Sequence, residues 1–179
     1  MKRKALIAMI LTFVLLGLCC ACGTQSVPDY LAFRGHEWEA EIRGERDGAP
    51  FSAKIAVTPT EENTTVRVEY LTPDALCGIS LTAACDADGT PCGTAELRRG
   101  ETVISGEAAD FYGLLEPTLC WFLLGAHTAV QKEGTLFVLH FSDGVSVTLD
   151  EKGDPKSYSA PRLWYDVVWL EKGSEVKKG

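Results

Sequence analysis

Apolar and polar residues alternate with a period of two along much of the chain, and this pattern constrains the fold most strongly. The alternation is clearest in residues 37–43, 51–58 and 66–70. A period of two places successive side chains on opposite faces of a strand. Sheets with one apolar face and one polar face are typically antiparallel. Asp-Gly pairs at 47–48, 88–89 and 143–144 indicate the turns of a meander.

The two later turns also predict which residues pair across their hairpins. A three-residue loop at 87–89 with a left-handed Gly89 places Leu97 opposite Ile79 and Ala95 opposite Leu81. A two-residue loop would set apolar residues opposite polar ones, so the register that keeps one face apolar is favoured. The same reasoning at 142–144 predicts three apolar pairs: Phe141 with Val145, Leu139 with Val147, and Phe137 with Leu149.

Residues 110–125 break the alternation. This segment is apolar on nearly all sides from Leu119 to Leu124. Pro117 suits the first turn of a helix, and Gly125 suits its end. A helix that is apolar all round has to be covered broadly, and the apolar face of a curved sheet is the simplest cover. A strand is the alternative for this segment.

The first 22 residues have the organisation of an export signal. Basic residues at 2–4 precede a long uncharged apolar run, and small residues follow it at 19–23 (CCACG). This arrangement resembles the lipobox of bacterial lipoproteins, in which a peptidase cuts before a cysteine that carries diacylglycerol. Cys22 is the best candidate because small residues flank it. Cys19 stands where leucine is usual, so Cys19 and Cys20 are alternative sites.

Two other interpretations of this segment stay open, namely a plain secretory signal cut after Ala21 and an uncleaved membrane helix. The apolar run is short for a membrane span, which disfavours the helix. A cut before Cys22 leaves 158 residues and removes three basic ones, so the net charge changes from −8 to −11. Such an acidic chain is not a generic nucleic-acid binder. We therefore expect a lipid-anchored protein on the extracytoplasmic face of the cell membrane.

Four cysteines remain beyond the signal, at 77, 85, 92 and 120. In the predicted register Cys85 points into the core and Cys92 faces Ala84 on the polar face, which disfavours a Cys85–Cys92 disulfide. We expect free buried thiols, and the alternative is a disulfide, for which Cys120 with Cys85 or Cys77 is a better pairing than Cys85 with Cys92. The spacings contain no short zinc-ligand pair, and we expect no metal or other cofactor. The chain lacks the common catalytic and nucleotide-binding motifs, so we do not expect an enzyme.

The predicted elements therefore follow one another along the chain as a lipobox, a short tether, antiparallel strands, one apolar helix and further strands. This order is similar to that of the LolA/LolB-type lipoprotein carriers and sorting proteins, and the similarity covers most of residues 33–171. The resemblance also depends on three short sequence segments, at 70–76 (YLTPDAL), 88–91 (DGTP) and 153–155 (GDP). The resemblance implies a mainly β (α+β) fold, in which a strongly curved, unclosed antiparallel half-barrel wraps one apolar helix.

We accordingly divide the chain into a signal peptide at 1–21, a lipidated cysteine with its tether at 22–32, one curved-sheet domain at 33–171, and a polar tail at 172–179. The resemblance also implies a lipid, acyl or other apolar ligand between sheet and helix. The alternative is a structural or protein-interaction envelope lipoprotein with a filled core. The residues that would line the ligand site are Trp38, Phe51, Tyr70, Leu81, Trp121, Phe122, Phe137, Phe141 and Trp169.

Overall fold

The computed structural model describes residues 27–175, with the side chains of all of these except 32, 33 and 171–175. The predicted signal peptide and the predicted lipidation site Cys22 lie outside the described residues. Within residues 27–175 no helix has the length and apolar content needed to cross a membrane. The elements, with η denoting a 3-10 helix, are η1 (Ala32–Gly35), β1 (His36–Arg46), β2 (Ala49–Pro59), β3 (Thr64–Thr72), β4 (Ile79–Cys85), β5 (Pro91–Arg99), β6 (Thr102–Glu107), η2 (Ala108–Phe111), α2 (Tyr112–Phe122), β7 (Ala129–Glu133), β8 (Leu136–His140), η3 (Ser142–Gly144), β9 (Ser146–Leu149), β10 (Pro155–Ala160) and β11 (Leu163–Glu175).

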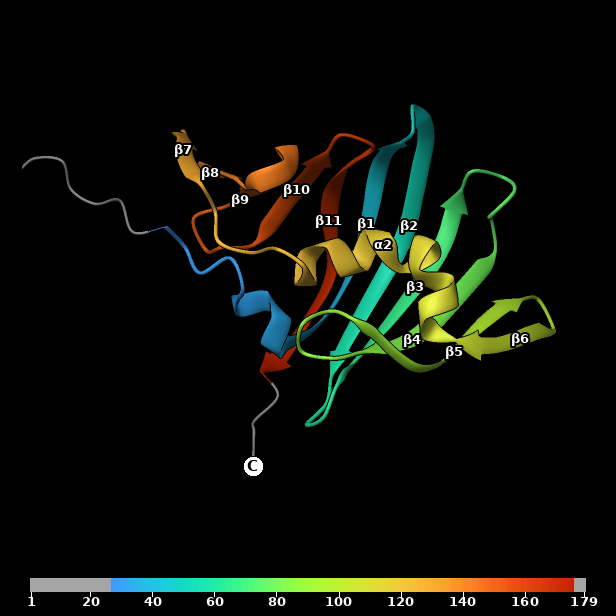
Figure 1. The fold of residues 1–179 in the computed structure, drawn as a ribbon. Coiled ribbons are helices and arrows are strands. Elements are labelled where there is room, and N and C mark those ends of the chain that lie inside the picture. The colour runs from blue at the N-terminus through green and yellow to red at the C-terminus, as the bar shows by residue number, and fades with distance from the viewer. Residues whose placement is uncertain (1–26, 176–179) are drawn as a thin grey trace, which may run out of the picture.

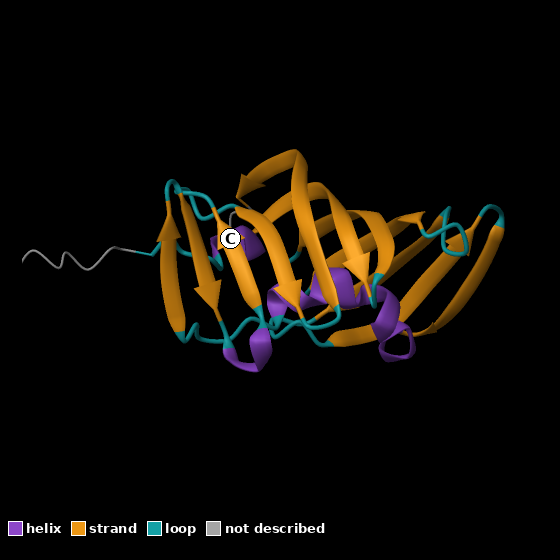
Figure 2. Ribbon diagram, turned by 90° about the horizontal axis from the view of Figure 1, so that it is seen from above, coloured by secondary structure: helices purple, strands orange, loops and turns teal. Residues whose placement is uncertain are grey.

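The strands form one antiparallel sheet of 11 strands in the order β6-β5-β4-β3-β2-β1-β11-β10-β9-β8-β7. Two meanders meet where β1 pairs with β11. The first meander ends at the β6 edge and the second begins at the β7 edge, so the connection through η2 and α2 has to cross one face (Figures 1 and 2). The predicted mainly β, antiparallel and unclosed sheet with one helix is confirmed.

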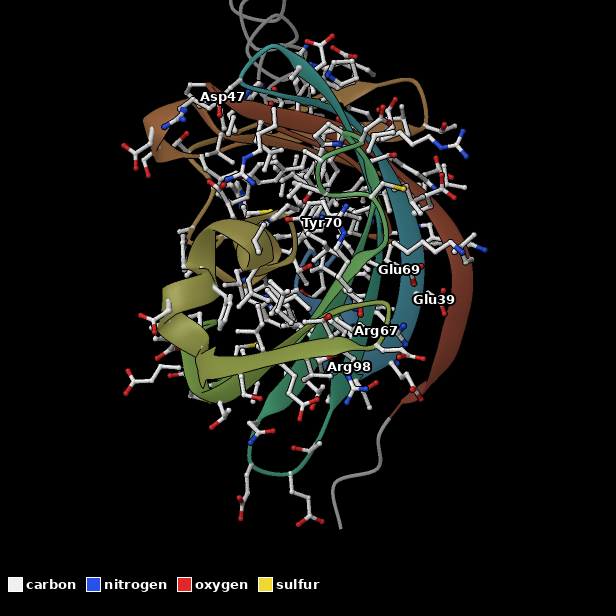
Figure 3. All side chains as sticks on the ribbon, turned by 90° about the vertical axis from the view of Figure 1, so that its right-hand side faces the viewer. Glu39, Asp47, Arg67, Glu69, Tyr70 and Arg98 are labelled. Carbon is white, nitrogen blue, oxygen red and sulfur yellow. The ribbon has the colours of Figure 1, made fainter. Side chains whose placement is uncertain are left out.

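The alternating pattern separates a buried face from an exposed face, as predicted. Strands β1, β2, β3 and β4 each bury every second residue along their central part. Figure 3 shows Tyr70 pointing into the space between the sheet and α2, whereas Glu39 and Glu69 point away from it. The buried face carries the core, and residues of α2 such as Leu115 and Leu119 belong to the same apolar cluster.

The two predicted hairpin registers have different outcomes. At 142–144 the pairs Phe137–Leu149 and Leu139–Val147 are both present, and the Phe141 N–H donates to the Val145 carbonyl at 2.9 Å, so this register is confirmed. At 87–89 the glycine is left-handed as predicted, and Cys92 lies opposite Ala84.

Farther along the 87–89 hairpin, the predicted pairing is wrong. Leu97 pairs with Leu81 rather than with Ile79, because the register shifts between Thr82 and Ala84. The extra residues on β5 surround Gly93, whose φ of 66° is typical of a glycine in a bulge. The shift moves the pairing by two residues and therefore keeps Leu97 on the same face as Leu81.

A helix does form in the segment that breaks the alternation, but Pro117 lies in its interior rather than in its first turn. The helix starts at Tyr112 and ends at Phe122. A proline there provides no N–H for the carbonyl four residues earlier, which belongs to Gly113. Arg46 replaces that donor, since its Nη1 donates to the Gly113 carbonyl at 2.8 Å. A side chain from β1 thus supplies a hydrogen bond that the helix cannot make for itself.

Both ends of the described chain join the domain. In the predicted tether at 22–32, the side chains of Val27 and Tyr30 pack against the core, so its described part does not stand apart from the domain. At the other end β11 continues to Glu175, where it pairs with His36. The predicted tail at 172–179 therefore begins inside this strand.

Candidate functional site

A cleft of about 250 Å³ lies beside the helix, and we call it the α2–β10 cleft. Its walls come from α2 and the residues that follow it, from the turn between β8 and β9, and from β10. The lining residues are Tyr112, Glu116, Cys120, Leu123, Leu124, Gly125, Ala126, Phe141, Ser142, Asp143, Val145 and Tyr158. It lies on the flank of the helix that faces the second meander.

The helix presents one stripe of side chains to this cleft. Tyr112, Glu116 and Cys120 are spaced four residues apart, so they lie above one another on the same face. Leu123 at the end of α2 continues the stripe and is one of the exposed large apolar residues of the domain. The remaining faces of α2 bury apolar side chains against the sheet, including Leu115 and Leu119. The stripe therefore presents the polar side chains of Tyr112 and Glu116 to the cleft.

Cys120 and Tyr158 form the floor of the cleft, and they belong to a buried cluster that also contains Tyr165 beneath it. The Tyr165 hydroxyl donates to the Pro117 carbonyl at 2.7 Å and lies 3.0 Å from the Cys120 Sγ. The Cys120 thiol also donates to the Pro117 carbonyl at 3.4 Å, and either atom could be the donor in the contact between Cys120 and Tyr165. Tyr158 stacks on Tyr165 at 5.5 Å between ring centroids, and Trp121 packs edge-on against both rings.

Burial keeps these groups neutral at physiological pH. It raises the pKa of the Cys120 thiol to about 12, and it raises the pKa of Tyr158 and of Tyr165 above the usual value of 10. Thiolate is the nucleophilic and metal-binding form of cysteine, so a thiol of this kind is inert. The floor of the cleft can therefore offer apolar contact and hydrogen bonds from neutral groups.

A carboxylate at the rim is held by an ion pair. The Arg46 Nη2 lies 2.6 Å from the Glu116 Oε2, and the same guanidinium holds the Gly113 carbonyl. The hydroxyl of Tyr70 on β3 donates to the Leu114 carbonyl at 2.7 Å. These contacts fix the first half of α2 to β1 and β3 and thereby fix one wall of the cleft.

The segment just after the predicted anchor holds the opposite end of the same wall. The Tyr30 hydroxyl donates to the Gly125 carbonyl at 2.7 Å, and its ring makes edge contacts with His127 and Phe141. The Arg34 Nη2 donates to the Trp121 carbonyl at 2.7 Å and to the Leu124 carbonyl at 3.3 Å. The last carbonyls of a helix have no partner within the helix, so Arg34 caps α2 at Trp121, and the other two contacts hold the residues that follow the helix.

The nine predicted site residues lie in three different places. Phe141 lines the α2–β10 cleft. Trp38, Trp121 and Trp169 line a second hollow beneath the helix, with a volume of about 10 Å³. That is roughly the space of a single water molecule. The other five are buried in the core: Phe51, Tyr70, Leu81, Phe122 and Phe137.

The cleft residues that sequence reasoning missed carry only weak local signals. A helix predicted to begin several residues before Pro117 would have placed Tyr112, Glu116 and Cys120 on one face, because they are spaced four residues apart. Tyr30 and Arg34 had no local signal, because their partners are about 90 residues away in the chain.

The four described cysteines are free thiols, two buried (Cys85 and Cys120) and two at least partly accessible (Cys77 and Cys92). Within residues 27–175 no cluster of three or more His, Cys, Asp or Glu side chains is arranged to hold a metal ion.

No protein-family model matches the chain, and no curated protein is similar enough in sequence to count as a relative.

Proposed function

We propose that this chain is a lipid-anchored extracytoplasmic binding protein that holds a small acyl or other apolar ligand in the α2–β10 cleft. In this proposal the curved sheet wraps α2 as in LolA/LolB-type carriers, but the ligand lies beside the helix rather than beneath it. The observation that carries it is the contrast between the two hollows. The cleft has about 250 Å³, while the space beneath the helix has about 10 Å³.

The lining of the cleft supports a ligand with an apolar body and a polar group. Ligand sites are concave and mostly apolar, with a few polar groups that set orientation. Leu123, Leu124 and Phe141 provide the apolar surface, Tyr112 and Ser142 provide hydroxyls, and the carboxylates of Glu116 and Asp143 also line the cleft. The volume suits one short chain or the end of a longer one, since typical sites for drug-sized ligands begin at about 300 Å³.

The short distance between the predicted anchor and the cleft supports entry of a ligand from the membrane. The predicted lipidated Cys22 is five positions before Val27, so these two lie at most about 18 Å apart. From there Tyr30 and Arg34 reach directly to the end of α2 that forms the cleft wall. An anchor at Cys22 would therefore hold the cleft close to the lipid surface.

Binding is tested with a fluorescent fatty acid on residues 23–179, a segment that contains every described contact. We expect saturable binding that unlabelled decanoate displaces. Ala126 is exposed and lines the cleft, so Ala126→Trp should fill part of it and weaken binding at least tenfold. Ala109 is also exposed and lies outside the cleft, and Ala109→Trp is the matched control. Absence of saturable binding, or equal effects of the two substitutions, would refute the proposed site.

The anchor is tested separately by metabolic labelling with an alkynyl fatty acid. The full chain should take up label, and Cys22→Ala should lose it. Label that persists in Cys22→Ala would reject Cys22, and a further substitution of Cys19 and Cys20 would then show whether a neighbour is used. A full chain that takes up no label would reject the lipoprotein assignment.

A second candidate function is that of a protein-interaction lipoprotein, and one observation favours it. The face of β11 that points away from α2 exposes Trp164, Val168 and Leu170, which are the large apolar residues of an otherwise polar surface. Exposed apolar patches rimmed by polar residues often mark interaction sites. A photo-crosslinking residue at position 168 should then give one defined product in cells. The same residue at position 82, on the polar face of β4, is the control, and equal products from both would reject this candidate.

A further inference from the structure

The apolar rows of the core end at the β6 edge without being covered. Directly paired residues on the buried face form one row from the sheet centre outward, with Ala40, Ile55, Val68, Leu81, Leu97 and Ile104 on six successive strands. The first four are at most 1% exposed, whereas Ile104 is 54% exposed. The row is thus a continuous apolar ridge whose last member lies half in solvent.

Strand β6 has few of the features that protect a free edge. Its sequence, TVISGE, contains no lysine or proline, its one charge is Glu107 at the last position, and Val103 on its other face is 44% exposed. The opposite edge, β7, carries Lys132 and Glu133, and proteins commonly use such charges to prevent edge-to-edge pairing. Figure 1 shows β6 at the limit of the described sheet, with no described strand beyond it. Its outward backbone groups therefore remain open to another strand.

We propose that β6 pairs with β6 of a second copy of this chain, antiparallel and centred on Ile104. In an antiparallel pair, opposite residues share a face of the sheet. This register places Ile104 opposite Ile104, Thr102 opposite Gly106, and Val103 opposite Ser105. The core row then continues across the junction as Leu97, Ile104, Ile104 and Leu97 of the two copies. A register centred on Ser105 would set Ile104 against Gly106 and lose this apolar contact.

Local charge also favours a second copy at this edge. The chain as a whole carries a net charge of −8, so two copies repel each other over most of their surfaces. Strands β5 and β6 and their turn are nearly balanced, with Arg98 and Arg99 against Glu96, Glu101 and Glu107. Arg98 and Glu96 neutralise each other at 2.9 Å. The two like-charge approaches, in which Glu107 of each copy lies opposite Glu101 of the other, fall at the two ends of the paired strands, where the side chains remain in water.

Disulfide trapping in the full chain tests both the pairing and its register. Opposite residues of an antiparallel pair have Cα atoms about 4.5–5.5 Å apart, within disulfide range. Ile104→Cys should therefore give at least ten times more covalent dimer than the unsubstituted chain under mild oxidation of membranes from producing cells. Val103→Cys together with Ser105→Cys should also give dimer, whereas Val103→Cys alone should give little. Gln131→Cys on the exposed β7 edge is the control and should give none above background.

Three results would overturn the proposal: no excess dimer from Ile104→Cys, equal dimer from Gln131→Cys, or equal dimer from Val103→Cys with and without Ser105→Cys. A mass measurement by sedimentation of the purified full chain in detergent provides a test without new cysteines. The unsubstituted chain and the turn variant Thr135→Lys should sediment as dimers and Ile104→Lys as a monomer. A monomeric unsubstituted chain, or dimeric Ile104→Lys, would contradict the pairing. Ile104 lies outside the cleft, so fatty-acid binding should not change in Ile104→Lys.

Discussion

Replacing Arg34 by methionine should loosen the end of α2 and lower the stability of the whole domain. Arg34 donates to two carbonyls at the C-terminal end of the helix, and its guanidinium lies 5.8 Å from the centre of the Phe122 ring. A hydrogen bond from a charged group contributes about 1.5–3 kcal/mol. The contact at 3.3 Å is weak, and the cation–π contact adds about 0.5–1 kcal/mol.

Desolvation reduces this sum. Burial lowers the pKa of Arg34, and its Nε has no hydrogen-bond partner among the described atoms, so the fold already bears a cost for holding the charge. Methionine removes that cost while it keeps most of the apolar stem. We therefore expect a net loss of about 2 kcal/mol in unfolding free energy, which corresponds to about 4–8 °C in melting temperature for a domain of this size.

The assay is thermal and urea unfolding of residues 23–179 followed by circular dichroism, with Arg43→Met as the matched control. Arg43 pairs with Glu41 at 2.6 Å, but its side chain is 69% exposed, and such surface pairs contribute little. The melting temperature of Arg43→Met should stay within error of the unsubstituted protein. Equal losses for the two variants, or no loss for Arg34→Met, would show that Arg34 does not cap α2.

Three further outcomes follow from burial and close approach. Burial raises the pKa of Cys120 and of Tyr70 to about 12 from ordinary values of 9 and 10, so the unfolded chain releases these protons first as pH rises. The contribution of these two groups to stability should therefore be constant below about pH 8, and stability should fall between pH 9 and 12, with a shallower fall in Cys120→Ala. A urea midpoint that is equal at pH 8 and 10 would disagree. A Cβ at Gly44 would overlap the carbonyl oxygen of Trp164 on β11, so Gly44→Ala should cost about 2–3 kcal/mol in unfolding experiments. Gly113 in α2 has open space around it, so Gly113→Ala should instead gain about 0.5–1 kcal/mol, and a loss there would contradict the helix geometry.

The features predicted from sequence are those that depend on local pattern. The period-two alternation predicted which face of β1 to β4 is buried. The requirement that apolar residues lie opposite one another predicted the register of the 142–144 hairpin. The 87–89 hairpin was predicted correctly only near its turn, because matching faces cannot detect a shift of two residues. Gly93 within the strand was the available sign of that bulge.

Strand β6 and the cleft depend on contacts that no local pattern encodes. In β6 the adjacent apolar residues Val103 and Ile104 break the period of two, as expected at an edge where both faces are partly in water. Pro117 suggested a later helix start, because a proline in a helix interior ordinarily costs a hydrogen bond, and Arg46 from β1 supplies it instead. Only the tertiary structure reveals that compensation.

The most direct test of the central claim is a nuclear magnetic resonance titration of residues 23–179 with decanoate. The proposed function predicts saturable amide shifts centred on Leu123, Ala126 and Asp143 around the cleft. Shifts centred instead on Trp38 and Trp169 would place the ligand beneath the helix. That outcome, or a spectrum that decanoate leaves unchanged, would contradict ligand binding in the α2–β10 cleft.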